Sequence, residues 1–237
     1  MIELEIIACS VEDAVAAYDG GASRLEVTVG LSQDGLTPPL PMVGEILRQA
    51  PIPARIMIRQ CNAFTLAGPD ELEIIKQCVR SFAPLEVDGL VVGYIRNGSL
   101  DLRALEQILN LSPSTRFTIH NAIERTLDPP QALRALRSFP NVDRALVHGG
   151  TDKPLPERIA RLRQYKEAFG AGRELIIGGG ITLDVLGAFR RETDFHVFHL
   201  GRAVRTPEEP SGKVDVQKVK TARALLTGEA LRRPADI

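Results

Sequence analysis

The chain has 237 residues with an ordinary globular composition, and its 29 basic and 30 acidic side chains leave a formal net charge of −1 at pH 7. This balance gives the whole protein no attraction toward nucleic acid or an acidic membrane surface, so we expect neither as a partner. No apolar run approaches the roughly 18 residues of a membrane helix, and the acidic start Met1–Glu5 is unlike a signal peptide. We therefore expect a cytoplasmic protein.

Short runs rich in β-branched residues recur along the whole chain and are bounded by turn-forming residues, a pattern that predicts strands. In chain order the predicted strands are Ile2–Ala8, Arg24–Thr28, Ala54–Arg59, Gly89–Val92, Arg116–His120, Arg144–Val147, Glu174–Ile177 and Phe195–His199.

Amphipathic stretches lie between these strands, and apolar residues recur in them at helical spacing. Ser10, Asp70 and Thr182 are expected to cap helices, because their side-chain oxygens can accept hydrogen bonds from free N–H groups in the first turn. The predicted helices are Val11–Tyr18, Pro69–Phe82, Leu100–Leu109, Pro129–Leu136, Leu155–Phe169 and Leu183–Phe189.

Eight strands, each followed by a helix at about thirty residues a unit, predict an α/β fold, the TIM (β/α)8 barrel. A doubly wound open sheet with the same element order is the main rival, because the pattern alone does not show closure. Chain length and unit count both favour the barrel. We predict a single domain over residues 1–237, with a tail that frays after about residue 228.

Glycine-bearing turns follow the last two predicted strands, at Gly178–Ile181 and Leu200–Ala203. In this fold such turns often bind a phosphate through backbone N–H groups, and glycine lets the backbone approach an anion closely. Tight turns that only require glycine are the alternative. A similar turn after the sixth strand could add donors. The predicted phosphate-binding residues are Gly149, Gly150, Gly178, Gly179, Gly180, Gly201 and Arg202.

Polar side chains lie near the carboxyl ends of four predicted strands, where barrel enzymes carry their chemistry. Side-chain alternation turns Glu5 and Glu26 into the barrel, and Arg59 and His120 end their strands. Such a set can move protons: a carboxylate or the histidine acts as base, and the arginine holds an anionic substrate or one carboxylate. A buried ion network around Arg59, without chemistry, is the alternative.

The other histidines are predicted to be structural. His148 and His199 are each expected to be packed or hydrogen-bonded rather than catalytic, and His196 is expected to face the helices.

Several short segments match one known family, in an order that spans most of the chain. They are Leu4–Ile6, Ser10–Ala14, Gly20–Glu26, Gly35–Pro38, Ile58–Arg59, Thr118–His120 with Ala122, and Gly178–Ile181. On these segments the chain resembles the CutC family, long described as copper homeostasis proteins. The resemblance implies a TIM-type barrel, a cytoplasmic location and a link to copper.

The sequence departs from the family pattern beside the shared residues. The family commonly has a cysteine two places after each of the two strand glutamates, where this chain has Ile7 and Thr28. After the third-strand arginine the family expects Pro-Arg-Gly-Gly-Asp-Phe, and this chain reads Gln60–Phe64. After the fifth-strand histidine it expects Arg-Ala-Phe-Asp, and this chain reads Asn121–Glu124. These departures favour a divergent relative that uses the shared cavity for a different ligand.

The three cysteines, Cys9, Cys61 and Cys78, are widely spaced and form no C-x-x-C pair, so neither a disulfide framework nor a zinc site is predicted. Reduced copper requires soft thiolate or thioether ligands. Only Cys9, Cys61 and Met57 are expected near the barrel mouth, and Cys78 lies in an apolar helical stripe. No metal site is favoured, and Cu(I) would bind through Cys9 and Cys61 only in the copper alternative.

The favoured function is a small-molecule enzyme of isomerase, epimerase or lyase type, which moves protons without a metal on a small anionic or phosphorylated metabolite. Glu5 or Glu26 would be the base, His120 the partner acid and Arg59 the anion clamp. No organic cofactor is predicted. The alternatives are a copper-binding or copper homeostasis protein and a metabolite-binding barrel without catalysis. Oligomeric state and substrate identity do not follow from the sequence.

Overall fold

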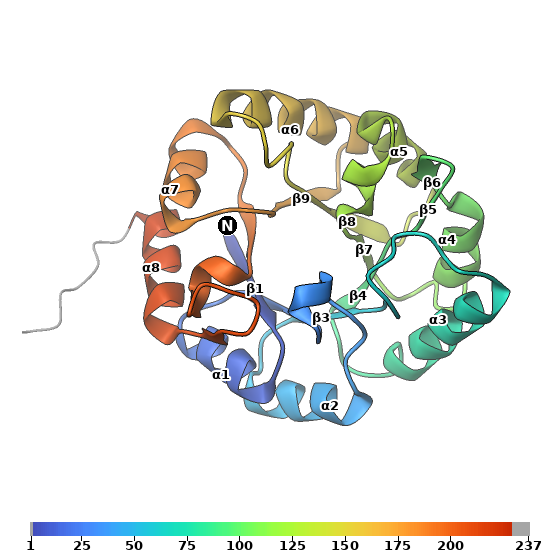
Figure 1. The fold of residues 1–237 in the computed structure, drawn as a ribbon, viewed down its shortest axis with the longest axis horizontal. Coiled ribbons are helices and arrows are strands. Elements are labelled where there is room, and N and C mark those ends of the chain that lie inside the picture. The colour runs from blue at the N-terminus through green and yellow to red at the C-terminus, as the bar shows by residue number, and fades with distance from the viewer. Residues whose placement is uncertain (1, 229–237) are drawn as a thin grey trace, which may run out of the picture.

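Eight parallel strands close into a barrel in the computed structural model, which describes residues 2–228 (Figure 1). The barrel closes where the first strand pairs with the last, from Glu3 opposite Val197 to Ile6 opposite Leu200. Closure confirms the α/β TIM barrel and excludes the open sheet. The strands, in barrel order, are β1 (Glu3–Ala8), β2 (Arg24–Val27), β3 (Ala54–Met57), β4 (Gly89–Val92), β7 (Phe117–Ile119), β8 (Val142–Val147), β9 (Glu174–Ile177) and β10 (Val197–Leu200).

Figure 1 shows the helices as a ring outside the barrel. All eight predicted strands are present, with ends that shift by one or two residues, and the sequence predicts no bounds for α2 and α8. The helices are α1 (Val11–Asp19), α2 (Leu40–Gln49), α3 (Pro69–Phe82), α4 (Leu102–Leu109), α5 (Pro129–Ala135), α6 (Leu155–Phe169), α7 (Leu183–Glu192) and α8 (Val216–Thr227).

Two of the three predicted helix caps are confirmed. Ser10 and Thr182 accept hydrogen bonds from the third N–H group of α1 and α7, respectively. Asp70 is not a cap, because α3 begins at Pro69 and Gly68 holds the capping position. Asp70 instead lies in the first turn, where its negative charge complements the helix dipole. The predicted frayed tail, after about residue 228, lies outside the described residues.

Two short hairpins and several 3-10 helices lie outside the barrel strands and the eight helices. The hairpin of β5 (Ile95–Arg96) and β6 (Ser99–Leu100) follows β4, and the hairpin of β11 (Arg205–Thr206) and β12 (Lys213–Val214) follows β10. Four short 3-10 helices also occur among the described residues: η1 (Leu31–Gln33), η2 (Asn121–Arg125), η3 (Leu136–Ser138) and η4 (Arg202–Val204).

An ion network fills the amino-terminal half of the barrel, and it is centred on Arg55. The Arg55 guanidinium donates hydrogen bonds of 2.7 Å to Asp88, to both carboxylate oxygens of Asp143 and to the Thr118 hydroxyl. Arg24 joins it through Asp88, which also binds Arg55. Glu3 then pairs with both Arg24 and Arg144, at 3.1 and 2.9 Å. A buried ion network was one alternative in the sequence analysis, but Arg59 is not its centre. With this half filled, free space is left at the opposite end of the barrel.

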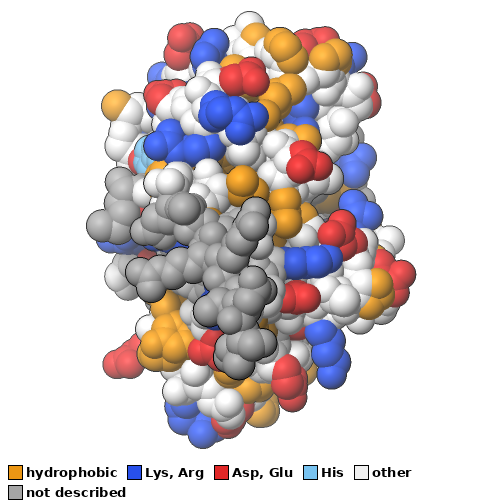
Figure 2. All heavy atoms as spheres, turned by 90° about the vertical axis from the view of Figure 1, so that its left-hand side faces the viewer, with side chains coloured by type: hydrophobic (Ala, Val, Ile, Leu, Met, Phe, Trp, Pro, Cys, Tyr) orange, Lys and Arg blue, Asp and Glu red, His pale blue; other side chains and the backbone are white. Residues whose placement is uncertain are grey.

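The outer surface carries mixed charge. Figure 2 shows the face on the left-hand side of Figure 1, where basic and acidic side chains alternate with small hydrophobic groups and neither sign gathers into a patch. Among the described residues, no helix combines the length and the apolar character needed to cross a membrane. Attraction for an anion must therefore come from a local site rather than from the overall field.

Candidate functional site

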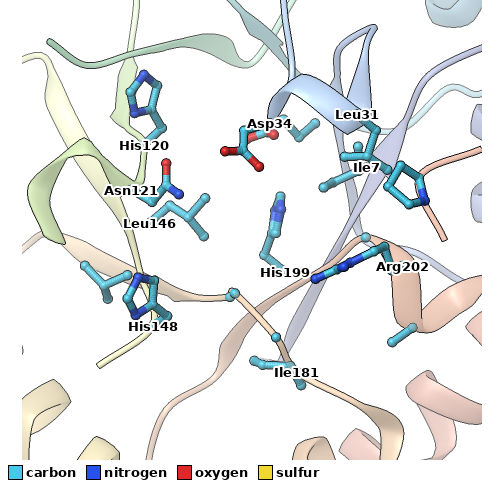
Figure 3. Close-up of a pocket in the computed structure, with 18 of the residues that line it drawn as sticks. Ile7, Leu31, Asp34, His120, Asn121, Leu146, His148, Ile181, His199 and Arg202 are labelled. Carbon is cyan, nitrogen blue, oxygen red and sulfur yellow. The ribbon is translucent and has the colours of Figure 1, made fainter. Parts of the chain in front are cut away.

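A cavity of about 490 Å³ lies at the carboxyl-terminal end of the strands, and Figure 3 shows its lining. The volume suits a small-molecule ligand. The side chains and turns that line it include Glu26, His120, Asn121, His148, His199, Arg202 and the glycines 178–180 and 201. Strands from opposite sides of the barrel thus contribute polar groups to one space, which is the arrangement expected of a TIM-barrel active site.

Glu5 and His199 form a buried pair at the base of this cavity. They face each other as register partners in β1 and β10, and His199 Nδ1 lies 2.8 Å from Glu5 Oε1. Burial alone would raise the pKa of Glu5, but the hydrogen bond and charge of His199 lower it below its usual value. Burial lowers the pKa of His199, yet the negative charges of Glu26 and Glu5 raise it above the ordinary value overall. Both shifts favour a carboxylate bound to an imidazolium.

Glu26 lies beside this pair and titrates differently. Burial raises its pKa to about 7, an effect that the charge of His199 opposes and the charge of Glu5 strengthens. Among the described residues, no hydrogen bond to its carboxyl group contributes to this shift. At neutral pH both protonation states of Glu26 are populated, so it can accept a proton from a ligand and return it.

One potential metal-binding group is present among the described residues. The ligand atoms of Glu5, Glu26 and His199 all lie within 4.8 Å of one another. This group contains no thiolate, so it lacks the soft ligands that Cu(I) prefers. The thiols of Cys9 and Cys61 do not belong to this group. Cys9 Sγ lies 3.6 Å from an Arg205 nitrogen, and Cys61 Sγ lies 3.6 Å from Glu71 Oε1.

His120 lies in the cavity wall as a neutral side chain. It is 1% exposed, and its Nδ1 accepts a hydrogen bond of 3.1 Å from the Ala122 N–H. Burial, with the nearby charge of Arg59, lowers the pKa of His120 to about 3. Because Nδ1 is an acceptor, the single proton of the neutral ring is on Nε2, and that atom has no partner among the described residues. The sequence predicts an acid at this position, and the neutral ring presents its Nε2–H as the donor.

Arg59 is buried away from the two glutamates. Its guanidinium donates to the carbonyl oxygens of Asp34, at 3.1 Å, and Asn62, at 2.5 Å, and it lies 4.5 Å above the centre of the Phe64 ring. It does not line the cavity. Arg59 thus joins two loops at the mouth, and the geometry does not make it an anion clamp or a partner of Glu5 or Glu26.

The turns after β9 and β10 present unused backbone donors. Among the described residues, the N–H groups of Gly179, Gly180, Gly201 and Arg202 donate to no other group, whereas Gly178 N–H donates to Val147 O at 2.9 Å. Gly179 and Gly180 have φ of +69° and +64°, a conformation that favours glycine. The first turn also leads into the amino terminus of α7, whose dipole favours a negative charge.

Arg202 adds a charge beside these donors. Its side chain is exposed and lines the cavity. A guanidinium in this position can bind a phosphate in a bidentate manner. We therefore keep Gly179, Gly180, Gly201 and Arg202 as the candidate anion site.

In the turn after β8, the N–H groups of both glycines are already paired within the protein. Gly149 N–H donates to a Glu124 carboxylate oxygen at 2.9 Å, and Gly150 N–H donates to His148 Nδ1 at 2.9 Å. Neither glycine lines the cavity. These internal acceptors occupy the groups expected to bind phosphate, so we leave Gly149 and Gly150 out of the candidate site.

His199 and His148 are hydrogen-bonded, as the sequence predicts, and both also line the cavity. His199 points into the middle of the cavity and His148 lies in its wall (Figure 3). Burial, together with the charge of Arg158, lowers the pKa of His148 to about 4. The signal for His199 was present in the sequence, because the alternation that turns Glu5 inward applies equally to the strand that pairs with it.

A family model matches this chain over residues 2–204, and it describes the CutC family. A protein of Xanthomonas axonopodis pv. citri (strain 306) named family protein CutC is 30% identical over 242 residues, covering 97% of this chain and 99% of that protein. A Homo sapiens protein named copper homeostasis protein cutC homolog is 31% identical over 181 residues, covering 76% of this chain and 65% of that protein.

Two solved structures are also similar. A copper homeostasis protein CutC from Streptococcus agalactiae aligns with a TM-score of 0.76 and 25% identity, over 85% of this chain and 98% of that one. Phosphoribosyl anthranilate isomerase from Thermococcus kodakaraensis aligns with a TM-score of 0.63 and 14% identity, over 95% of this chain and 99% of that one. At such low identity the second likeness shows the fold alone.

Proposed function

The chain belongs to the CutC family, and from this premise we propose that it is an enzyme that transfers a proton on a small phosphorylated metabolite, in an isomerase, epimerase or lyase reaction. One observation carries the proposal: Glu26, whose pKa burial raises to about 7, shares a cavity with the unpaired backbone donors of the last two turns. A group that exchanges protons and a site for an anion thus face the same small space.

The phosphate would bind at the candidate anion site. The N–H groups of Gly179, Gly180 and Gly201 are its donors, and the Arg202 guanidinium supplies positive charge. Charge-assisted hydrogen bonds contribute about 1.5 to 3 kcal/mol each, enough to fix the orientation of a small ligand. Binding at this end leaves the rest of the ligand near Glu26 and His199.

Glu26 is the base in this proposal. As a carboxylate it accepts a proton from a carbon of the ligand, and as a carboxylic acid it returns one. His199 is held by Glu5, and its positive charge favours the carboxylate form of Glu26. Glu5 therefore positions His199 and does not act as the base itself.

Ligand binding tests the anion site. Native mass spectrometry of the protein with a library of sugar phosphates identifies ligands, and calorimetry gives their Kd. We expect Arg202→Ala to weaken the binding of phosphate esters about tenfold or more. Arg103→Ala, an exposed arginine on α4, is the matched control and should bind as the wild type does. Equal affinity for wild type and Arg202→Ala would show that the anion lies elsewhere.

Isotope exchange tests the chemistry without knowledge of the product. Each retained phosphate is incubated with the protein in D2O, and loss of a carbon-bound proton signal is followed by NMR. Glu26→Gln should slow this exchange by a factor of about 10² or more, while Glu106→Gln, at an exposed position of α4, should not. A ligand that binds but exchanges no proton would favour a metabolite-binding barrel without catalysis.

Copper handling is the second candidate, because relatives at 31% and 25% identity are named copper homeostasis proteins. It requires Cu(I) uptake through Cys9 or Cys61. Burial raises the pKa of Cys9 to about 11, which disfavours its thiolate. Cu(I) titration under reducing conditions, with the double variant Cys9→Ser and Cys61→Ser, tests this role. Stoichiometric uptake that the double variant loses would support copper handling against the enzyme proposal.

A further inference from the structure

We infer that the substrate carries a carbonyl oxygen at the end opposite its phosphate, and that His120 donates a hydrogen bond from Nε2 to this oxygen. This inference rests on the proposed function, because it needs a phosphate ester in the cavity and Glu26 as the base. The substrate class is a phosphate monoester of a hydroxy aldehyde or hydroxy ketone.

The tautomer of His120 is set by the backbone. Residue 120 caps the 3-10 helix η2, and its Nδ1 accepts the Ala122 N–H at 3.1 Å. No proton can occupy Nδ1 while this bond is present, so the neutral ring carries its proton on Nε2. The ring is also fixed in place, since the Phe64 ring meets it edge-on at 5.5 Å between centroids.

A buried donor without an acceptor costs free energy, which a ligand oxygen would recover. His120 is 1% exposed, it lines the cavity, and its Nε2 has no partner within residues 2–228. An acceptor brought by a ligand would satisfy this donor. Positive charge is absent from the ring, so the complementary ligand group is an oxygen that gains negative charge during reaction rather than a permanent anion.

The position of His120 suits a ligand that carries a phosphate at one end and a carbonyl group at the other. In Figure 3, His120, Asn121 and His148 lie along one wall of the cavity, on the left of the view, and Arg202 lies across the cavity on the right. His199 stands between these sides. A phosphate at Arg202 therefore directs the remainder of the ligand past the acid-base group toward His120.

The reaction step balances with the groups present. The Glu26 carboxylate accepts the proton from the carbon next to the carbonyl, and the electrons of that C–H bond form a carbon–carbon double bond. The carbonyl π electrons move to the oxygen, which becomes an enolate oxygen bound by the His120 Nε2–H. Return of the proton from Glu26 to carbon restores the carbonyl, so the step needs no oxidant or reductant.

Two phosphate esters separate this inference from the proposed function. In 2-phosphoglycolate a planar carboxylate copies the charge and shape of an enolate, and glycerol 3-phosphate lacks a carbonyl. We expect the wild type to bind 2-phosphoglycolate about tenfold or more tightly than glycerol 3-phosphate. If neither ester binds at millimolar concentration, the proposed function fails. If both bind with equal affinity, the anion site stands and the role of His120 is wrong.

His120→Asn is the variant of choice. An asparagine oxygen can replace Nδ1 as the acceptor of the Ala122 N–H, while the donor at the Nε2 position is lost. We expect this variant to lose the preference for 2-phosphoglycolate and to keep the wild-type affinity for glycerol 3-phosphate. An unchanged preference in a folded variant would overturn the inference.

Nitrogen NMR of the wild type provides a test that needs no variant. In the ¹⁵N-labelled protein at pH 7, His120 should show an unprotonated Nδ1 and a protonated Nε2. Addition of 2-phosphoglycolate should shift the Nε2 proton downfield and leave the protonation state unchanged. Two protonated nitrogens, or an Nε2 signal that does not respond to the saturating ligand, would contradict the inference.

Discussion

His199 Nδ1 lies 2.8 Å from Glu5 Oε1, between register partners in the two strands that close the barrel. Both side chains are buried, so the pair is protected from solvent screening. The contact assigns different roles to two glutamates that look equivalent in the sequence. Glu5 is hydrogen-bonded to His199. Glu26 has a pKa of about 7, and no hydrogen bond among the described residues contributes to it.

The charge of His199 should control the titration of Glu26. His199 lowers the pKa of Glu26 and Glu5 raises it, with His199 the stronger influence. His199→Asn removes the charge and keeps a donor for Glu5, so the pKa of Glu26 should rise. We expect the ¹³C signal of the Glu26 carboxyl group, assigned by its loss in Glu26→Gln, to titrate near pH 7 in the wild type and at higher pH in the variant.

His196→Asn is the control for this titration. His196 is 40% exposed and contacts Glu174, so the midpoint for Glu26 should stay at its wild-type value. A midpoint that falls in His199→Asn would mean that the positive charge of His199 is not what holds Glu26 partly ionised.

Glu26 should also make stability depend on pH. Its pKa is about 7 in the folded state and about 4.5 when unfolded, so between these values the folded state binds more protons. The free energy of unfolding therefore falls as pH rises through this window, by on the order of 2 to 3 kcal/mol from this group. Glu26→Gln has no such loss. Relative to the wild type, it should gain stability from pH 5 to pH 8, measured by urea unfolding. A difference that stays constant over this range would place the pKa of Glu26 in the acid range.

Most of the fold could be predicted from the sequence because its signals are local. The apolar runs that form the eight barrel strands and the helical spacing of α3 and α6 mark each unit of the barrel separately. The exact bounds of α3 and α6 agree with the prediction. Closure was favoured by the unit count, and the pairing of β1 with β10 confirms it.

The site was less predictable because it depends on contacts between distant segments. Strand alternation correctly predicts that Glu26 faces the cavity. Arg59, however, lies beyond the end of β3, and its guanidinium donates to carbonyl oxygens of two loops. No sequence pattern predicts these contacts. The same limit applies to Gly149, whose N–H group is taken by Glu124, 25 residues earlier in the chain. Spacing places a residue at the mouth of the barrel; it does not say which groups there are already paired.

The network around Arg55 should contribute to stability and not to ligand binding. Arg55 is 1% exposed, and its removal leaves Asp88 and Asp143 without their main partner. Loss of one member of a buried pair costs about 3 to 5 kcal/mol. We expect Arg55→Met to approach the lower end of this range in urea unfolding, because the two aspartates are partly exposed. The affinity for phosphate esters should be unchanged in the folded variant.

A surface arginine provides the comparison for Arg55. Arg48 is 72% exposed at its side chain and pairs with Glu45, so Arg48→Met should cost less than about 1 kcal/mol. Equal losses for the two variants would show that the network in the barrel does little for stability.

Gly179 should be required for anion binding. The loss of affinity on its replacement should be separable from the loss of folding stability that a positive φ causes. An alanine at this position must adopt a φ of +69°, and its Cβ would lie 2.8 Å from the His148 Cβ. The turn would have to shift, which moves the Gly179 and Gly180 N–H groups away from the bound anion. Gly172 is the matched control, since its φ is +79° and a Cβ there meets no atom within 4 Å. Both Gly179→Ala and Gly172→Ala bear the left-handed strain of roughly 1 to 2 kcal/mol, but only the first should lose affinity for inorganic phosphate in a calorimetric titration. Retained affinity in Gly179→Ala would mean that the turn after β9 does not bind the anion.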